Sequence, residues 1–234
     1  MSSNDPGVEI RAQWGKMIRA IFWDNDGVLV DTERLYFEAT RRVLESVGVA
    51  LTESTFIETL MVRATGPWHL AVDRGFPESR IPDLKRERNA VYSKLITESD
   101  IAVPGALETV RRLHGRAAMA IVTSSRREHF RIIHEKTGIL QYIDFVIDAE
   151  DTTRYKPEPD PYLKALDRSG LSEAECLAVE DSERGLASAV AAGIRCVVIP
   201  RGLSRGGRFE GAWKVLSDIA EVEGVVEGEG NSSM

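Results

Sequence analysis

Short apolar runs alternate with helical patterns over much of the chain. Strand-like runs occupy residues 18–23, 117–122, 143–147, 175–179 and 194–199, and helix-like spacing occupies residues 127–138, 160–170 and 185–193. Short apolar runs bounded by polar residues are typical of buried strands, whereas apolar residues three and four apart are typical of helices. The alternation over residues 105–200 therefore predicts an α/β fold with a parallel sheet covered by helices on both faces.

Residues 34–100 interrupt this alternation. Their patterns are mainly helical, beginning with a segment in which Leu35, Ala39 and Val43 share one face and Gly48 follows as a terminator. We therefore expect a helical insertion at 34–100, between a first part of the sheet unit at 17–33 and the remainder at 101–222. Residues 1–16 are predicted to be a flexible leader. Residues 223–234, acidic and rich in glycine, are predicted to be a flexible tail.

Polar clusters follow four of the predicted strands. They are Asp24-Asn25-Asp26, Thr123-Ser124-Ser125, the loop that contains Lys156, and Glu180-Asp181-Ser182. The carboxyl ends of parallel strands meet at one edge of a sheet, where ligands of such folds bind. We expect these four clusters to face one crevice. Taken singly, each cluster has an ordinary alternative: a turn, a helix cap, or a solvated charge.

The residue types in these clusters indicate phosphoryl chemistry. Crowded carboxylates repel one another unless a cation lies among them, and oxygen ligands without nearby His or Cys suit Mg²⁺. Lys156 can neutralise further charge and hold a phosphate, and hydroxyls and loop amides can bind other phosphate oxygens. Asp24 is then a candidate nucleophile toward phosphorus, and Asp26 a candidate acid and base.

The four clusters together resemble the motifs of the haloacid dehalogenase superfamily. The similarity is to its branch with an inserted helical cap, which contains β-phosphoglucomutase-like proteins and small-molecule phosphatases. It extends over residues 18–200, with all motifs in order. The matching segments are Asp24-Asn25-Asp26-Gly27-Val28 with Asp31-Thr32-Glu33, Ile121-Val122-Thr123-Ser124, KPEPDPY with Lys156, and Val179-Glu180-Asp181-Ser182.

This resemblance implies a Rossmann-like doubly wound core with a helical cap domain, and a role for each matching residue. Asp24 would be the nucleophile, and Asp26 the general acid and base. The implied Mg²⁺ site is formed by Asp24, Asp26, Glu180 and Asp181. The implied phosphate-binding residues are Asn25, Gly27, Thr123, Ser124 and Lys156.

The resemblance also narrows the reaction. A carboxylate at the position of Asp26 marks phosphate-ester chemistry, in contrast to dehalogenation. The β-phosphoglucomutase pattern has a His four residues after the position of Thr32, where this chain has Tyr36. That difference favours a Mg²⁺-dependent phosphatase acting on a small phosphorylated metabolite, with a sugar phosphate as one candidate. The alternatives are a phosphosugar mutase and, in another class, a non-catalytic ligand-binding or regulatory protein on the same fold.

Cap residues are expected to determine substrate choice. Arg63 is a candidate to bind a second anionic group, with a cap-surface residue as the alternative, and Trp68 is a candidate to stack on a sugar or ring. Arg86 and Arg88, on the predicted helix near residue 90, are further candidates to face the crevice.

Composition restricts the environment and the partners. The formal net charge of −7 argues against a nucleic-acid binder. Cys176 and Cys196 lie in apolar surroundings without a CxxC spacing, which indicates reduced, buried thiols and a cytoplasmic protein. No apolar run approaches the roughly 20 residues of a membrane span, and the first residues lack the pattern of a signal peptide. We expect a monomer that binds neither nucleic acid nor membrane.

Overall fold

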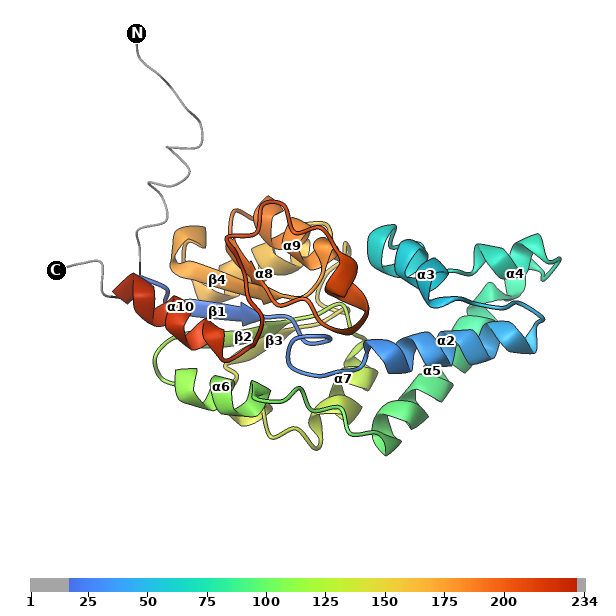
Figure 1. Ribbon diagram of the computed structural model, residues 1–234, viewed down its shortest axis with the longest axis horizontal. Helices are drawn as coiled ribbons and strands as arrows, with labels where there is room; N and C mark the ends of the chain where they lie inside the picture. Colours follow the sequence, from blue (N-terminus) through green and yellow to red (C-terminus); the bar gives the residue numbers. More distant parts are fainter. Residues whose placement is uncertain (1–16, 231–234) are drawn as a thin grey trace, which may run out of the picture.

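A six-stranded sheet forms the centre of the protein, for which a computed structural model describes residues 17–230 (Figure 1). The strand order is β3-β2-β1-β4-β5-β6, and every neighbouring pair is parallel. The strands are β1 (Ala20–Trp23), β2 (Ala118–Val122), β3 (Phe145–Ile147), β4 (Cys176–Glu180), β5 (Arg195–Val198) and β6 (Lys214–Val215). The predicted parallel α/β sheet is confirmed.

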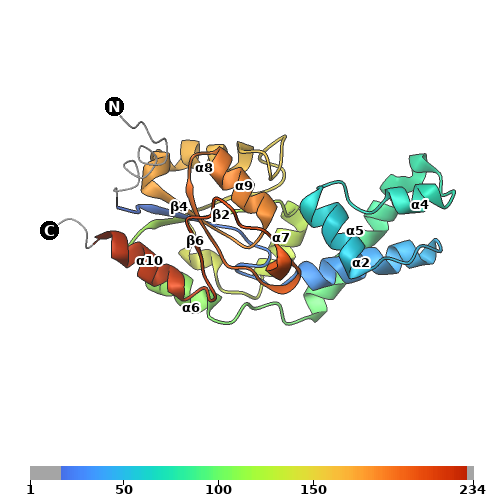
Figure 2. The ribbon, with the colours of Figure 1, turned by 45° about the horizontal axis from the view of Figure 1, so that its top comes forward.

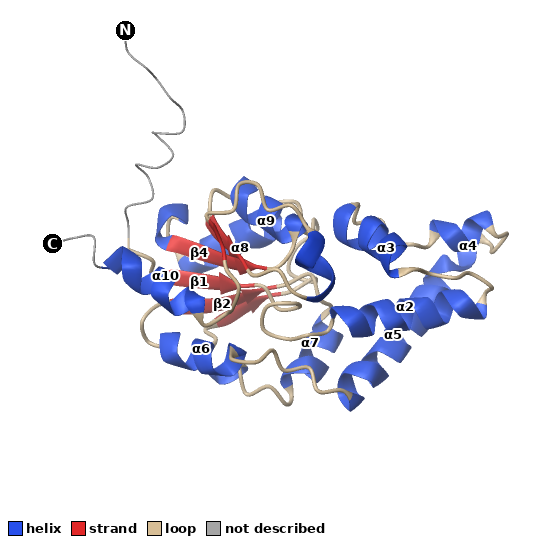
Figure 3. Cartoon of the chain, viewed as in Figure 1, coloured by secondary structure: helices blue, strands red, loops and turns tan. Residues whose placement is uncertain are grey.

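Helices cover both faces of this sheet (Figure 3). They are α6 (Ala106–Leu113), α7 (Arg127–His134), α8 (Asp160–Ser169), α9 (Glu183–Ala191) and α10 (Glu221–Gly230). Successive strand side chains point to opposite faces. Accordingly, Ile21 and Trp23 of β1 join an apolar cluster with residues of α6 and α10, whereas Ala20 and Phe22 join one with residues of α8 and α9. The sheet therefore has an apolar cluster on each of its two faces.

A group of helices lies beyond the carboxyl ends of the strands (Figures 1 and 2). It comprises α2 (Glu33–Ser46), α3 (Glu53–Phe56), the π-helical η1 (Ile57–Val62), α4 (His69–Asp73), the 3₁₀ turn η2 (Glu78–Arg80) and α5 (Ile81–Glu98). An apolar cluster within it includes Leu44, Phe56 and Trp68 and is joined by Leu203 from outside the group. We call this group the cap. The chain leaves and re-enters the core at one place, because the Asp31 N–H donates to the Ile101 carbonyl at 2.9 Å.

The end of the described chain differs from the sequence-based expectation. Residues 221–230 form α10, and Val222, Val225 and Val226 are buried in the core. The expectation of a flexible tail is therefore wrong for residues 223–230, because valines three and four apart give this glycine-rich stretch one continuous apolar face. The expected leader at 1–16 and residues 231–234 lie outside the described part of the chain.

Two further observations bear on composition. Cys176 and Cys196 are both free and buried, on the neighbouring strands β4 and β5, as their apolar surroundings predict. Among the helices of residues 17–230, none is long and apolar enough to cross a membrane.

Candidate active site

The loop after β1 places two carboxylates at the carboxyl edge of the sheet. The Asp24 N–H donates to the Val179 carbonyl at 2.8 Å, so Asp24 is fixed directly beside β4. The loop then turns back tightly, since the N–H groups of Leu29 and Val30 both donate to the Asn25 carbonyl. Gly27 has a φ of 87°, and a Cβ there would lie 2.1 Å from Oδ2 of Asp181. Only glycine combines this backbone with so close an approach.

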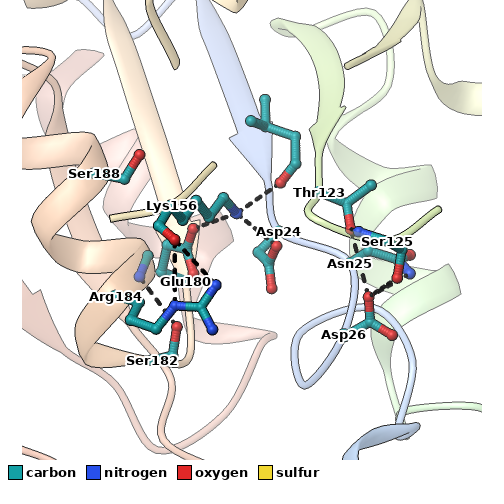
Figure 4. Close-up of polar contacts among 12 residues, drawn as sticks. Asp24, Asn25, Asp26, Thr123, Ser125, Lys156, Glu180, Ser182, Arg184 and Ser188 are labelled. Atoms are coloured by element: carbon teal, nitrogen blue, oxygen red, sulfur yellow. Dashed lines mark hydrogen bonds and ion pairs between the residues drawn. The ribbon is translucent and has the colours of Figure 1, made fainter. Parts of the chain in front are cut away.

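Lys156 connects three strands at the centre of the site. Its Nζ donates to Oδ1 of Asp24 at 2.6 Å, to Oε1 of Glu180 at 2.6 Å and to the Val122 carbonyl at 2.7 Å (Figure 4). Tyr162 donates a further hydrogen bond to Oε1 of Glu180. Burial alone would lower the pKa of Lys156, but the two carboxylates raise it above its ordinary value. Lys156 is therefore a permanent cation with every ammonium hydrogen directed.

Three buried carboxylates lie close together at this place. Ligand oxygens of Asp24, Glu180 and Asp181 all lie within 4.8 Å of one another. Burial raises the pKa of Asp24 to about 8, more than Lys156 lowers it. Burial and the nearby charges of Glu33 and Asp24 also raise the pKa of Asp181 well above its usual range. Oε2 of Glu180 is buried without a hydrogen-bond partner. Excess negative charge and oxygen-only donors fit a hard divalent cation at this place.

Asp26 lies on the other side of Asp24 and is held by neutral donors (Figure 4). Its Oδ2 accepts hydrogen bonds from the Ser125 hydroxyl at 2.6 Å, the Asn25 amide at 3.2 Å and the Thr123 hydroxyl at 3.4 Å. Its Oδ1 accepts a short hydrogen bond from the Thr32 hydroxyl. The two carboxylates of the motif therefore have different surroundings, one ionic and one hydroxylic.

A cavity of about 260 Å³ lies between the sheet edge and the cap. From the core, its lining includes Asp24, Asp26, Thr123, Ser124, Ser125, Arg126, His129, Lys156, Asp181, Ser182 and Arg184. From the cap side, it includes Thr32, Glu33, Tyr36, Phe56, Leu60, Met61, Asn89 and Tyr92. A second cavity of about 350 Å³ shares Tyr36, Phe56 and Leu60 with it and extends to Trp68 and Arg88. The two together offer room for a small polar molecule.

The structure brings together most of the residues expected at the site. Six line the first cavity: Asp24, Asp26, Thr123, Ser124, Lys156 and Asp181. Asn25 and Gly27 form the loop beneath them, and Glu180 is fully buried behind Lys156. Arg63 does not join this group, because its side chain is 67% exposed and pairs with Glu58. Of the other cap candidates, Trp68 and Arg88 line the second cavity, whereas Arg86 is exposed and pairs with Asp83.

The sequence analysis did not identify two residues that make hydrogen bonds to other elements of the fold. Arg184 of α9 donates to the Leu60 carbonyl in the cap at 2.8 Å and to the Lys156 carbonyl at 3.0 Å, so it ties cap to core. Ser204 donates to Oδ2 of Asp181 at 3.0 Å. The only signal for Arg184 was its position two residues after the serine that follows the acidic pair. Nothing local marked Ser204.

Comparisons with known proteins agree with this geometry. The sequence model for haloacid dehalogenase-like hydrolases matches residues 21–199. Protein CbbY from Rhodobacter capsulatus is 30% identical over 210 residues, covering 85% of this chain and 92% of that protein. The phosphorylated carbohydrates phosphatase from Thermotoga maritima is 31% identical over 181 residues, covering 76% and 82%.

Solved structures lead to the same family. The structure of a CbbY mutant from Rhodobacter sphaeroides in complex with xylulose-(1,5)bisphosphate has a TM-score of 0.75 at 25% identity, covering 88% of this chain and 96% of that chain. The sequence match, this structural likeness and the four motifs at one sheet edge have a single explanation: this chain belongs to the family of haloacid dehalogenase-like hydrolases.

Proposed function

We propose that this hydrolase cleaves phosphate monoesters of small metabolites, with sugar phosphates as the main class, through a phosphoryl group carried transiently on Asp24. The observation that carries the proposal is the setting of Asp24. Lys156 binds its Oδ1, Oδ2 accepts no hydrogen bond from residues 17–230, and the side chain lines the cavity. The names of the relatives, a phosphorylated carbohydrates phosphatase and a protein solved with a sugar bisphosphate, support the substrate class.

A divalent cation, Mg²⁺ by the chemistry of its donors, belongs to the proposal. The residues that would hold it are Asp24, Glu180, Asp181 and the backbone carbonyl of Asp26. When bound, it would offset negative charge on the phosphoryl oxygens and on the crowded carboxylates.

In the first step, Asp24 attacks phosphorus. A bond forms between its carboxylate oxygen and phosphorus while the bond from phosphorus to the leaving oxygen breaks. Asp26 donates its proton to that oxygen, so the product leaves as an alcohol. Lys156 holds Asp24 in place through Oδ1, and the hydroxyls of Thr123 and Ser124 lie in the cavity wall beside it. The positive charge of Lys156 and these hydroxyls stabilise negative charge on the equatorial oxygens.

In the second step, water attacks phosphorus on the opposite side from Asp24. Asp26, now a carboxylate, accepts a proton from that water, and the bond to Asp24 breaks to release inorganic phosphate. The aromatic and aliphatic residues of the cap side restrict bulk water around the acyl phosphate. Arg184 keeps η1 against the core while this happens, through its hydrogen bond to the Leu60 carbonyl.

Release of phosphate from p-nitrophenyl phosphate and from a panel of sugar phosphates tests this function. We expect Mg²⁺-dependent hydrolysis, lost on chelation and lost in the Asp24→Asn variant. Asp167→Asn is the matched control, since Asp167 is exposed on α8. Full activity of the Asp24→Asn variant would refute the nucleophile. Interconversion of sugar phosphate isomers that needs a bisphosphate primer, with little phosphate released, would identify a mutase instead.

A further inference from the structure

His134 is buried at the end of α7, and both of its ring nitrogens are hydrogen-bonded. Its Nε2 lies 2.8 Å from Oδ1 of Asn25, and its Nδ1 lies 2.8 Å from Oγ1 of Thr137. The ring also packs on Phe130, with the ring centroids 4.4 Å apart. Packing alone would need no ring nitrogen, and a buried polar ring is costly unless both nitrogens find partners. The two hydrogen bonds therefore indicate that the ring nitrogens of His134 have a role besides packing.

The direction of these hydrogen bonds follows from Asp26. Nδ2 of Asn25 donates to Oδ2 of Asp26 at 3.2 Å, so the amide oxygen of Asn25 must face His134. Nε2 of His134 must then carry the proton and donate it, which leaves Nδ1 to accept from the Thr137 hydroxyl. Thr137 in turn accepts from the Ile139 N–H at 3.3 Å. The hydrogen bonds therefore form one chain in which every donor faces the same way, from the Ile139 N–H to the Asp26 carboxylate.

The ring is neutral at ordinary pH, which this direction requires. Burial lowers the pKa of His134 to about 4, although the charge of Asp26 acts in the opposite sense. A neutral imidazole has one N–H, and its position is set by the hydrogen bond at the other nitrogen. The Asn25 amide oxygen, which can only accept, and the Thr137 hydroxyl, which donates to Nδ1, therefore keep the proton on Nε2, facing Asn25.

The donor that reaches Asp26 in this way differs from the other three. Hydroxyls of Ser125, Thr123 and Thr32 can rotate and can accept as well as donate. The Asn25 amide cannot, because His134 fixes its other end. Because the amide always donates to Oδ2, it fixes the orientation of the Asp26 carboxylate within its ring of rotatable hydroxyls.

We propose that His134 is a positioning residue for catalysis: through Asn25 it fixes the orientation of the Asp26 carboxylate. The inference rests on the proposed function, in which Asp26 is the acid and base. His134 lies 109 positions along the chain from Asn25 and outside the four motifs described above.

Two substitutions at this position separate positioning from packing. The His134→Gln variant keeps an amide N–H near the place of Nε2, whereas His134→Phe removes every donor, and both alter the packing of α7. We expect His134→Phe to lower kcat for a sugar phosphate about tenfold or more with KM within about twofold, because misplaced catalytic groups cost turnover rather than binding. We expect His134→Gln to retain most of the activity.

The leaving group provides a second readout. p-Nitrophenolate leaves without protonation, whereas a sugar alkoxide needs the proton from Asp26. The loss in His134→Phe should therefore be smaller with p-nitrophenyl phosphate than with fructose 1-phosphate. A purely structural defect would lower both rates alike.

The Asn25→Leu variant completes the test. If the path runs through Asn25, adding His134→Phe to Asn25→Leu should lower kcat no further, and melting temperatures will show that each variant is folded. Nitrogen NMR of the metal-free wild type should show the Nε2–H tautomer of His134. Equal losses in the Gln and Phe variants, additive effects in the double variant, or a His134→Phe protein with wild-type kcat would overturn the proposal. The Asp24→Asn result is independent of all these outcomes, so failure of the proposed function would be recognised separately.

Discussion

The two walls of the cavity are built on different principles. The sheet edge is polar and hydrogen-bonded: Lys156 makes three hydrogen bonds, and Asp26 accepts from three hydroxyls and one amide. The cap wall presents Phe56, Leu60 and Met61, together with aromatic rings. In the adjoining second cavity of the cap, the buried cation Arg88 packs on the rings of Tyr36 and Trp68 and has no carboxylate partner within residues 17–230.

This difference separates the chemical step from the choice of substrate. The polar network at the sheet edge is sensitive to the loss of any member, because the remaining charges then stay buried without compensation. An apolar wall beside a cation without a carboxylate partner can instead bind ligands of different shapes, and an anionic group of a ligand can pair with the cation. Substitutions at the sheet edge should therefore abolish turnover for every substrate, and substitutions in the cap should change the ranking of substrates.

The largest effect is expected from Lys156→Met. The change leaves the carboxylates of Asp24 and Glu180 buried without their paired cation, so the free energy of unfolding should fall by about 3–5 kcal/mol, and hydrolysis should be lost with all substrates. Urea unfolding and phosphate release measure the two effects. Lys164→Met, on the exposed face of α8, is the control. Wild-type stability and turnover in Lys156→Met would contradict the role given to the sheet edge.

Gly27→Ala should have the next largest effect. A Cβ at this position would lie 2.1 Å from the Asp181 carboxylate, and the backbone φ of 87° is unfavourable for alanine. We expect kcat to fall about tenfold or more, since a small displacement of a reacting group is costly, and the melting temperature to fall.

Gly48→Ala isolates the cause of that loss. Gly48 has a similar φ of 77°, but a Cβ there meets nothing within 4 Å. Backbone strain alone costs roughly 1–2 kcal/mol and should leave kcat unchanged. Equal effects of the two substitutions on kcat would show that the approach to Asp181 is irrelevant.

The smallest effects are expected in the cap, at Arg88. Replacing Arg88 by Met keeps a long apolar side chain but removes the cation beside the second cavity. We expect KM to rise several-fold for sugar phosphates that carry a second anionic group, about 1 kcal/mol of binding, and kcat for p-nitrophenyl phosphate to stay within about twofold.

Arg63→Met is the matched substitution for this test. The Arg63 side chain is exposed and pairs with Glu58, so neither KM nor kcat should change. A larger effect at Arg63 than at Arg88 would assign the anion to the other side of the cap and would contradict the arrangement described above.

The sequence predicts the sheet edge well because its signals are local. Apolar runs end in polar residues at Asp24, Thr123 and Glu180, and the parallel topology alone places strand ends together. The cap is predicted only as helical. Which arginine side chain faces a cavity depends on how α2 and α5 pack against each other. The helical spacing of residues on either side of the turn at 63–68 does not determine this packing.

Long-range partners explain the other omissions. His134 lies in a segment that looks like an ordinary amphipathic helix, and its partner Asn25 is remote in sequence. Arg184 donates to a main-chain carbonyl of the cap, and because any residue type has such a carbonyl, the sequence does not indicate this contact. The acidic, glycine-rich composition of residues 221–230 concealed the valine face of α10.

The central claim is that phosphorus becomes bonded to Asp24. Acid quenching during turnover of p-nitrophenyl phosphate with Mg²⁺, followed by peptide mass spectrometry, measures this directly. We expect one phosphoryl group on the peptide that contains Asp24, located on that aspartate, and none in the Asp24→Asn variant. Steady release of phosphate with no phosphorylated Asp24 at any quench time, or with the label on another residue, would contradict the account.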